Sequence, residues 1–407
     1  MRKVNFSLFT PLMRISILLT LSIITVHFCH GFIDTIYWLT ATIMSMGIAL
    51  AFKTEMRQSL LLHLCIFCTG ALLTSHQMDV AQKPIQTMNE EDISSLDRTF
   101  LATQSFRQHI QQKMRTLDIQ DQDFAIISAM TLGDKSALSK ETKDIYAISG
   151  ASHVLAVSGL HIGIIFQFFI LLLGGRRRSP ITIFFALITI WSYVVFIGMP
   201  TSAIRSATLI SICCFSLLAN KEALSVNNLC LAYVIMLTIN PLYLFEISFQ
   251  MSFIAVFSIL LLLPSHPQKH GIMSWTTSMF RMSLAAQLGT IPLIAYYFGR
   301  ISCYSLLTSF IAIPAASLLL NFSVLALCLA LLAQIPGITI IATPLLQLVA
   351  KGLVITTQTC NTVLQLTTML PMASIEGIKI NIPQLCLIYT SIVVGYLLWK
   401  KRKALYS

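Results

Sequence analysis

The sequence predicts an all-α polytopic membrane protein with about 11–12 transmembrane helices, a short external helical segment and a broken or re-entrant helix. Hydrophobic residues make up 56% of the 407 residues and charged residues only 11%, whereas a globular domain carries about 25% charged residues. Apolar runs of roughly 20 residues recur along almost the whole chain, and a helix of that length crosses a bilayer. The first run lacks the small-residue cleavage site of a signal peptide and leads directly into the second.

The apolar runs define four predicted regions. Three spans occupy residues 1–75, a polar extracytoplasmic segment follows at 76–120, a channel domain covers 121–335, and C-terminal helices with a basic tail complete the chain at 336–407. The expected spans are 12–31, 33–52, 58–75, 152–174, 180–198, 202–220, 225–244, 246–263, 273–298, 301–334, 342–368 and 383–399.

The orientation follows from the lysines and arginines, which favour cytoplasmic loops. Arg2, Lys3 and Arg14 place the N-terminus in the cytoplasm, and the third span then delivers 76–150 to the outside. That stretch holds 8 basic and 11 acidic residues, although the whole chain has a net charge of +11. The "RRR" at 176–178 and the "KKRK" at 400–403 fall inside, so both termini are expected in the cytoplasm.

Two segments depart from simple spans. The stretch 301–334 is long for one span and short for two, and Pro314 interrupts it. We expect a broken or re-entrant helix there, which membranes tolerate where backbone is packed in protein or lines a watery cavity. Residues 121–150 predict two short amphipathic helices, split at Gly133-Asp134 and lying at the outer face.

The span beginning with "SHVLAVSGLHIG" (152–163) carries polar groups where hydrocarbon is expected. On a continuous helix His153 and His161 share one broad face, because each residue turns about 100°, and Ser158 lies on its flank. Gly150, Gly159 and Gly163 would allow close helix approach. The polar groups either fix helix packing by hydrogen bonds or line a functional pathway.

Several blocks of this sequence resemble one known family. The stretch "MTLGDKSALSKETKDIYAISGASHVLAVSGLHIGII" is similar to the signature of the competence domain of ComEC-type DNA-uptake proteins. Three further blocks follow in the family's order: "MPTSAIRSATLI" (199–210), "NPLYLFEISFQMSFIAVFSI" (240–259) and "LAAQLGTIPLIAYYFGRISCYSLLTSFIAIPAASLLL" (284–320). The resemblance covers about 120–335 and implies a channel in the bacterial inner membrane that passes single-stranded DNA into the cytoplasm during natural transformation.

The chain also departs from this family. The 76–120 segment is too short for the OB-fold domain that many relatives carry, and no HxHxDH cluster marks the metallo-β-lactamase-like domain in which many relatives end. Ser309 replaces the asparagine usual in the family block.

No cofactor, metal or catalytic site is expected, and no P-loop is present. The resemblance implies an external DNA receptor and a cytoplasmic ATP-driven helicase or DNA-binding protein as partners, and without a P-loop an ATP-driven motor would have to be another protein.

A DNA strand crossing a bilayer needs a wet and preferably positive path. Arg205 is the favoured phosphate contact, because it follows Pro200 at the start of a helix, where free N–H groups favour anions. The alternative is that the guanidinium of Arg205 reaches the lipid headgroups at the outer face. Glu246 is a candidate partner of Arg205, and Arg281, Arg300 and Lys351 are weaker basic candidates. The full set of pathway candidates is His153, Ser158, Gly159, His161, Arg205, Glu246, Gln250 and Gln287.

Three other hypotheses remain open. A small-molecule transporter or lipid flippase would use buried polar residues and a broken helix equally well. The "AVSG" at 156–159 has the local pattern of an intramembrane serine protease, but such enzymes supply the histidine base from another helix, and no other span carries a mid-membrane histidine. An inactive relative of the DNA-uptake proteins is the third.

Overall fold

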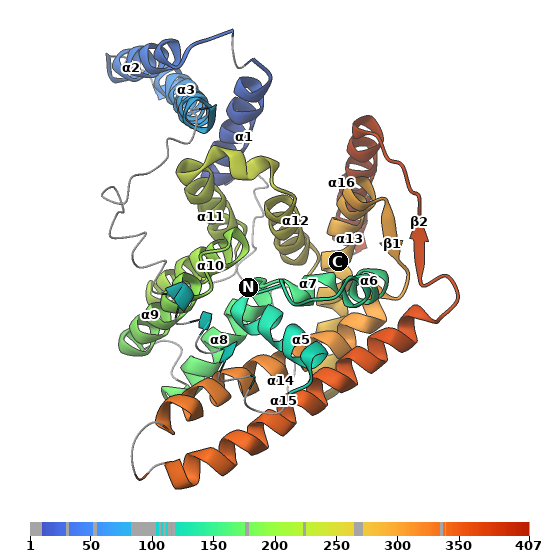
Figure 1. Ribbon diagram of the computed structural model, residues 1–407. Coiled ribbons are helices and arrows are strands. Elements are labelled where there is room, and N and C mark those ends of the chain that lie inside the picture. The colour runs from blue at the N-terminus through green and yellow to red at the C-terminus, as the bar shows by residue number, and fades with distance from the viewer. Residues whose placement is uncertain are drawn as a thin grey trace. The chain divides into compact units, whose positions relative to one another are not determined.

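The fold was analysed in a computed structural model (Figure 1). The structure describes residues 10–29, 32–51, 55–82, 103–105, 107–108, 111–112, 115, 119–175, 179–222, 225–263, 272–333, 337 and 339–406. Most of the 76–120 segment and the basic cluster at 176–178 lie outside these ranges. The external position of the segment and the orientation of the chain therefore stay predictions.

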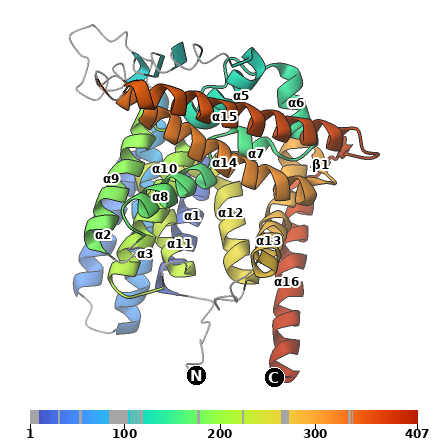
Figure 2. The ribbon, with the colours of Figure 1, turned by 90° about the horizontal axis from the view of Figure 1, so that it is seen from below.

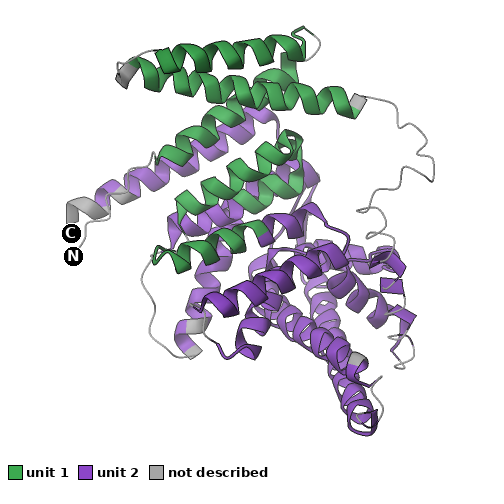
Figure 3. Cartoon of the chain, turned by 90° about the vertical axis from the view of Figure 1, so that its left-hand side faces the viewer, with its two compact units in different colours: residues 1–99, 208–253 green, residues 100–207, 254–407 purple. Residues whose placement is uncertain are grey.

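Contacts divide the chain into two compact units, which Figure 3 colours separately. Unit 1 comprises 1–99 and 208–253, and unit 2 comprises 100–207 and 254–407. Helices α10 (Thr201–Leu218) and α12 (Ile247–Leu262) each contain a boundary between units. The four predicted regions, 1–75, 76–120, 121–335 and 336–407, stay a prediction.

Unit 1 is a group of apolar helices. It contains α1 (Pro11–Cys29), α2 (Thr35–Ala51), α3 (Glu55–Gln82), α11 (Val226–Ile239) and the short 3-10 helix η2 (Pro241–Phe245). The hydroxyls of Thr20 and Tyr233 lie 2.8 Å apart and link α1 to α11. The rings of His27 and Phe245 pack at 4.2 Å between centroids, which brings η2 against the end of α1.

Unit 2 is built around two long helices. Its elements are α5 (Asp121–Leu132), α6 (Lys140–Ile148), α7 (Ser152–Leu155), α8 (Gly159–Leu172), α9 (Pro180–Phe196), α13 (Ile272–Phe298), β1 (Arg300–Ser302), α14 (Ser305–Leu332), α15 (Thr339–Thr368), β2 (Ser374–Glu376) and α16 (Ile382–Tyr406). Helices α14 and α15 lie side by side, and α5 packs on both (Figure 2). The core of the unit forms there, with fully buried side chains such as Ile127, Tyr146, Leu353 and Leu364.

The all-α membrane fold is confirmed. Within the described ranges six helices are long and apolar enough to cross a membrane, and five further apolar helices have 10–17 residues. The chain is therefore a multi-pass membrane protein. The expected number of 11–12 spans stays a prediction, because the shorter helices do not settle which of them cross.

The expected break at Pro314 is wrong. Helix α14 runs without interruption from Ser305 to Leu332 and contains Pro314 in its interior. A proline removes one backbone hydrogen bond, and packed membrane helices tolerate that loss. Helix α14 contacts α15, α8 and α13 on one side, whereas side chains such as Leu307 and Leu318 are exposed. The break in the unit lies instead between α7 and α8.

The two expected helices in 121–150 are present as α5 and α6, and Gly133 ends α5 in the left-handed conformation at φ 73°. The prediction that both are amphipathic surface helices is wrong for α5, because every residue from Asp123 to Leu132 is buried. Its sequence has hardly any polar face, and a helix that is apolar all round is buried in the core. Gln358 of α15 donates a hydrogen bond of 2.9 Å to the carboxylate of Asp123.

A polar clasp holds the turn after α5. Gln111 donates to the Asp134 carboxylate at 2.7 Å, and Arg107 donates to the carbonyl of Ile197 at 3.3 Å. Burial alone would raise the pKa of Asp134. Hydrogen bonds from Ser136 and Gln111, together with the charge of Arg107, outweigh burial and hold that pKa below its usual 3.8. The clasp therefore stabilises the ionised carboxylate.

Candidate functional site: a break between two helices

The "SHVLAVSGLHIG" stretch is not one helix. Helix α7 ends at Leu155, Ala156 is extended at φ −93° and ψ 140°, and α8 begins at Gly159. The expected continuous helix, with His153 and His161 on one broad face, is therefore wrong. The physical reason is that Ser158 stands at φ −121° and ψ 175°, which is the extended backbone of a helix N-cap, and serine is among the residues that N-caps favour.

His161 closes the start of α8. Its Nδ1 accepts the backbone N–H of Ser158 at 3.2 Å and lies 3.0 Å from the Ser158 hydroxyl. This is the geometry of a capping box with histidine in place of the usual glutamate or glutamine. Because Nδ1 accepts a hydrogen bond, a neutral ring carries its proton on Nε2. That Nε2 is buried and has no hydrogen-bond partner among the residues that the structure describes.

The contact between Ser158 and His161 has the length of a serine–histidine dyad, about 2.6–3.2 Å. A catalytic histidine is also oriented by a third group on its other ring nitrogen. Within the described ranges no such group meets Nε2 of His161. The pair is therefore arranged as a helix cap.

The start of α10 lies against the break. Ser202 donates a hydrogen bond of 2.6 Å to the carbonyl of Val157 in the extended stretch. A Cβ on Gly159 would lie 2.8 Å from the hydroxyl of Ser206, so the backbones of α8 and α10 approach closely here. The expected close approach at Gly163 is wrong, since nothing lies within 4 Å of a Cβ placed there.

Arg205 is the fifth residue of α10, and its exposed fraction is only 5%. An arginine that reaches the headgroups keeps its guanidinium in water, so this burial argues against a headgroup anchor. Arg205 belongs to unit 2 and Glu246 to unit 1. Their pairing therefore stays a prediction.

Gln250 and Gln287 make local contacts. Gln250 donates to the carbonyl of Leu244 at 2.9 Å, which ties the start of α12 to η2. The side-chain oxygen of Gln287 in α13 accepts a hydrogen bond of 3.2 Å from Ser305 in α14. His153 is exposed in α7, whereas His161 is buried.

Hydroxyl residues that the sequence analysis did not single out line the junction of α6, α7 and α14. Thr308 donates to the carbonyl of Ser149 at 2.7 Å, and Gly150 lies against both Ser302 and Ser305. The repeated serines and threonines of "SCYSLLTS" were the signal that could have identified them. Ser309 instead donates a hydrogen bond of 2.6 Å to the carbonyl of Ser305 in its own helix.

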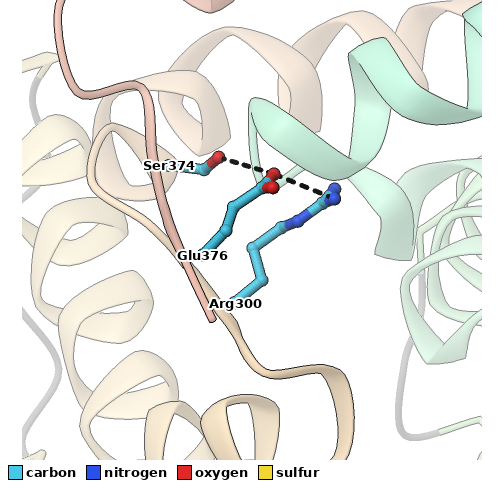
Figure 4. A network of polar contacts seen from close by, with 3 residues as sticks. All are labelled: Arg300, Ser374 and Glu376. Carbon is cyan, nitrogen blue, oxygen red and sulfur yellow. Dashed lines mark hydrogen bonds and ion pairs between the residues drawn. The ribbon is translucent and has the colours of Figure 1, made fainter. Parts of the chain in front are cut away.

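Arg300, one of the weaker basic candidates, is neutralised by an ion pair. Its guanidinium lies 2.9 Å from the carboxylate of Glu376, and the two residues also face each other in the antiparallel pair of β1 and β2. Figure 4 shows Ser374 and Arg300 on either side of that carboxylate. Arg300 is therefore a poorer phosphate contact than Arg205.

Comparisons with known proteins agree with the blocks quoted from the sequence. The family model described as Competence protein matches residues 130–402. ComE operon protein 3 of Bacillus subtilis (strain 168) is 31% identical over 212 residues, which cover 52% of this chain and 27% of that protein. Recombination protein 2 of Haemophilus influenzae (strain ATCC 51907 / DSM 11121 / KW20 / Rd) is 25% identical over 248 residues, or 56% of this chain and 30% of that protein.

An uncharacterized protein of Aquifex aeolicus (strain VF5) is 30% identical over 176 residues, which are 42% of this chain and 40% of that protein. The chain thus spans between a quarter and two fifths of the length of the curated relatives it matches. No solved structure matches it.

Proposed function

Because the chain belongs to the Competence protein family, we propose that it acts in DNA uptake, as a membrane channel through which single-stranded DNA enters the cytoplasm during natural transformation. The names of two matched relatives refer to a competence operon and to recombination. The proposal places the chain in the bacterial inner membrane with both termini in the cytoplasm. It assigns the chain no catalytic role.

The break between α7 and α8 is the observation that carries the proposal. Extended backbone at 156–158 interrupts an apolar segment, and the starts of α8 and α10 meet there. Helix N-termini carry partial positive charge and N–H groups without intrahelical partners, which suit phosphate. Broken helices serve membrane transporters in the same way, because their half-helix starts face anionic groups.

Two side chains add to this anion-favouring region. Arg205 brings a permanent charge to the start of α10, and its planar guanidinium matches a phosphate with two parallel hydrogen bonds. His161 brings the proton of its buried Nε2. A buried donor without an acceptor is costly by about 1–3 kcal/mol, and a passing phosphate oxygen or a water in the path would satisfy it.

The channel needs partners for the remaining work. A DNA receptor outside the membrane would deliver the strand, and an ATP-driven helicase or DNA-binding protein in the cytoplasm would draw it inward. The chain itself has no P-loop, so the energy of ATP hydrolysis would come from such a partner.

The test is transformation frequency in a deletion strain that expresses variants of the chain, each normalised to its abundance in the membrane. We expect Arg205→Gln to lower uptake about tenfold or more, because a hydrogen bond to a charged group contributes about 1.5–3 kcal/mol. Arg205→Lys should retain part of the activity, since the charge remains and the bidentate contact is lost. Arg300→Gln is the matched control and should stay near wild type, because its charge is already neutralised.

Other outcomes separate the alternatives. Normal uptake with Arg205→Gln would end the phosphate assignment. A low membrane abundance of Arg205→Gln that Glu246→Gln restores would identify a structural pair instead. If the deletion strain transforms as well as wild type, the chain transports something other than DNA, and a small-molecule transporter or lipid flippase becomes the better hypothesis.

A further inference from the structure

A groove separates the first turns of α1 and α3 in unit 1. Its volume is about 330 Å³ and it is open on one side. Small-molecule sites in proteins have volumes of about 300–1,000 Å³, so the groove is large enough for a headgroup-sized ligand. Its lining consists of Pro11, Arg14, Ile15, Gln58, Ser59, Leu62, His63 and Ile66.

The lining changes from polar to apolar along the groove. Arg14, Gln58 and Ser59 lie near the starts of the two helices, whereas Leu62 and Ile66 lie one and two turns deeper in α3. Leu19 of α1 packs against Gly70 of α3 still farther along. The two helices therefore run in the same direction, and the polarity of the groove follows their common axis.

The polar end of the groove is positive. Arg14 supplies a full charge, and its side chain is exposed. The ring of His63 is held through Nδ1 at the carbonyl of Ser59, so Nε2 remains as the other polar atom of that ring. The helix starts add their partial positive charge. Among the residues whose side chains the structure describes, no acidic side chain lines the groove.

We propose that this groove binds an anionic phospholipid, with its phosphate at Arg14 and Gln58 and the first part of an acyl chain along Ile15, Leu62 and Ile66. The chemistry of the lining carries the assignment. A free phosphate would leave the apolar end exposed to water. A zwitterionic lipid would bring a positive amine close to Arg14 together with its phosphate, whereas an anionic lipid brings a net negative charge. In the predicted orientation the lipid belongs to the cytoplasmic leaflet, where anionic headgroups attract basic residues.

The test is lipid binding by the purified, delipidated full chain in detergent, measured by native mass spectrometry with phosphatidylglycerol and phosphatidylcholine. We expect phosphatidylglycerol to bind more tightly. Arg14→Gln should weaken phosphatidylglycerol binding about fivefold, the effect of one basic residue at an anionic membrane surface, and should weaken phosphatidylcholine binding less, because that lipid has a phosphate but no net negative charge. Arg402→Gln, in the exposed basic end of α16, is the matched control and should change neither.

A second variant tests the groove itself. Ser59→Trp would fill the groove and should weaken both lipids, whereas Leu60→Trp should not, because Leu60 is 73% exposed and does not line the groove. Size-exclusion profiles identical to wild type would show that both variants fold. Equal binding of the two lipids by wild type, or equal losses in Arg14→Gln and Arg402→Gln, would overturn the proposal. Displacement of phosphatidylglycerol by excess inorganic phosphate would also overturn it, in favour of a free-anion site.

Discussion

Replacing Gly150 by alanine should destabilise the protein strongly. Gly150 has a φ of +80°, and a Cβ there would lie 2.6 Å from the Cβ of Ser305 and 3.0 Å from that of Ser302. The left-handed conformation costs an L-residue about 1–2 kcal/mol, and overpacking a well-packed site costs about 1–3 kcal/mol. Both opposing atoms are attached directly to backbone and cannot rotate away. We therefore expect Gly150→Ala to lower the free energy of unfolding by about 2–5 kcal/mol.

Two nearby glycines calibrate this prediction. At Gly159 the opposing atom is the rotatable hydroxyl of Ser206, so Gly159→Ala should cost less, and adding Ser206→Ala should relieve much of that cost. At Gly163 nothing lies within 4 Å, so Gly163→Ala should be neutral or should stabilise by up to about 1 kcal/mol through helix propensity.

The assay is thermal unfolding in detergent, followed by a thiol-reactive dye that reports exposure of the buried cysteines, which are Cys68, Cys214, Cys230 and Cys360. Because unfolding of membrane proteins is often irreversible, all variants should be compared at one heating rate. The expected order of midpoint temperatures is Gly163→Ala highest, Gly159→Ala next and Gly150→Ala lowest. A midpoint of Gly150→Ala equal to wild type would refute the close packing of the turn between α6 and α7 against Ser302 and the start of α14.

Two further predictions concern the polar contacts outside the core. Exchanging the charges of the Arg300–Glu376 pair, or replacing Glu376 by glutamine, should change the free energy of unfolding by less than about 1 kcal/mol, because such exposed pairs contribute little; a large drop in the unfolding midpoint would contradict this. The Asp134 carboxylate has a pKa below 3.8 in the folded chain, so its contribution to stability is present at neutral pH and is lost as the pH falls through that lowered value. Asp134→Asn should remove part of this acid sensitivity and weaken the contact between Gln111 and residue 134. The rate of proteolysis within residues 100–120 at neutral pH should therefore rise, and a rate equal to wild type would contradict the clasp.

The spans were predictable because a run of apolar residues specifies a membrane helix without reference to any partner. The expected spans at 202–220 and 342–368, for example, correspond to α10 and α15, two of the six described helices that are long and apolar enough to cross a membrane. Local chemistry was harder to interpret. A serine followed three residues later by histidine lacks the usual glutamate of a capping box, so the break at Ser158 and His161 was taken for the polar face of one long helix.

Contacts between distant residues were not predictable from the sequence. Arg300 and Glu376 are far apart along the chain, and nothing in either local pattern marks the other as its partner. The same holds for the burial of α5, since a twelve-residue apolar run is compatible with both a surface helix and a core helix. Which one forms depends on α14 and α15, whose sequences lie far downstream.

That dependence affects how the protein is made. Asp123 in α5 and its hydrogen-bond partner Gln358 in α15 are 235 positions apart. At a synthesis rate of about 5–20 residues per second, α5 leaves the ribosome roughly 10–50 s before its covering helices are complete. During that interval the part of α5 that α14 and α15 cover lacks these partners, although α7 and Tyr193 of α9, which also contact α5, have already been synthesised. The core of unit 2, which includes Leu353 and Leu364 of α15, is therefore complete only after α15 has been synthesised.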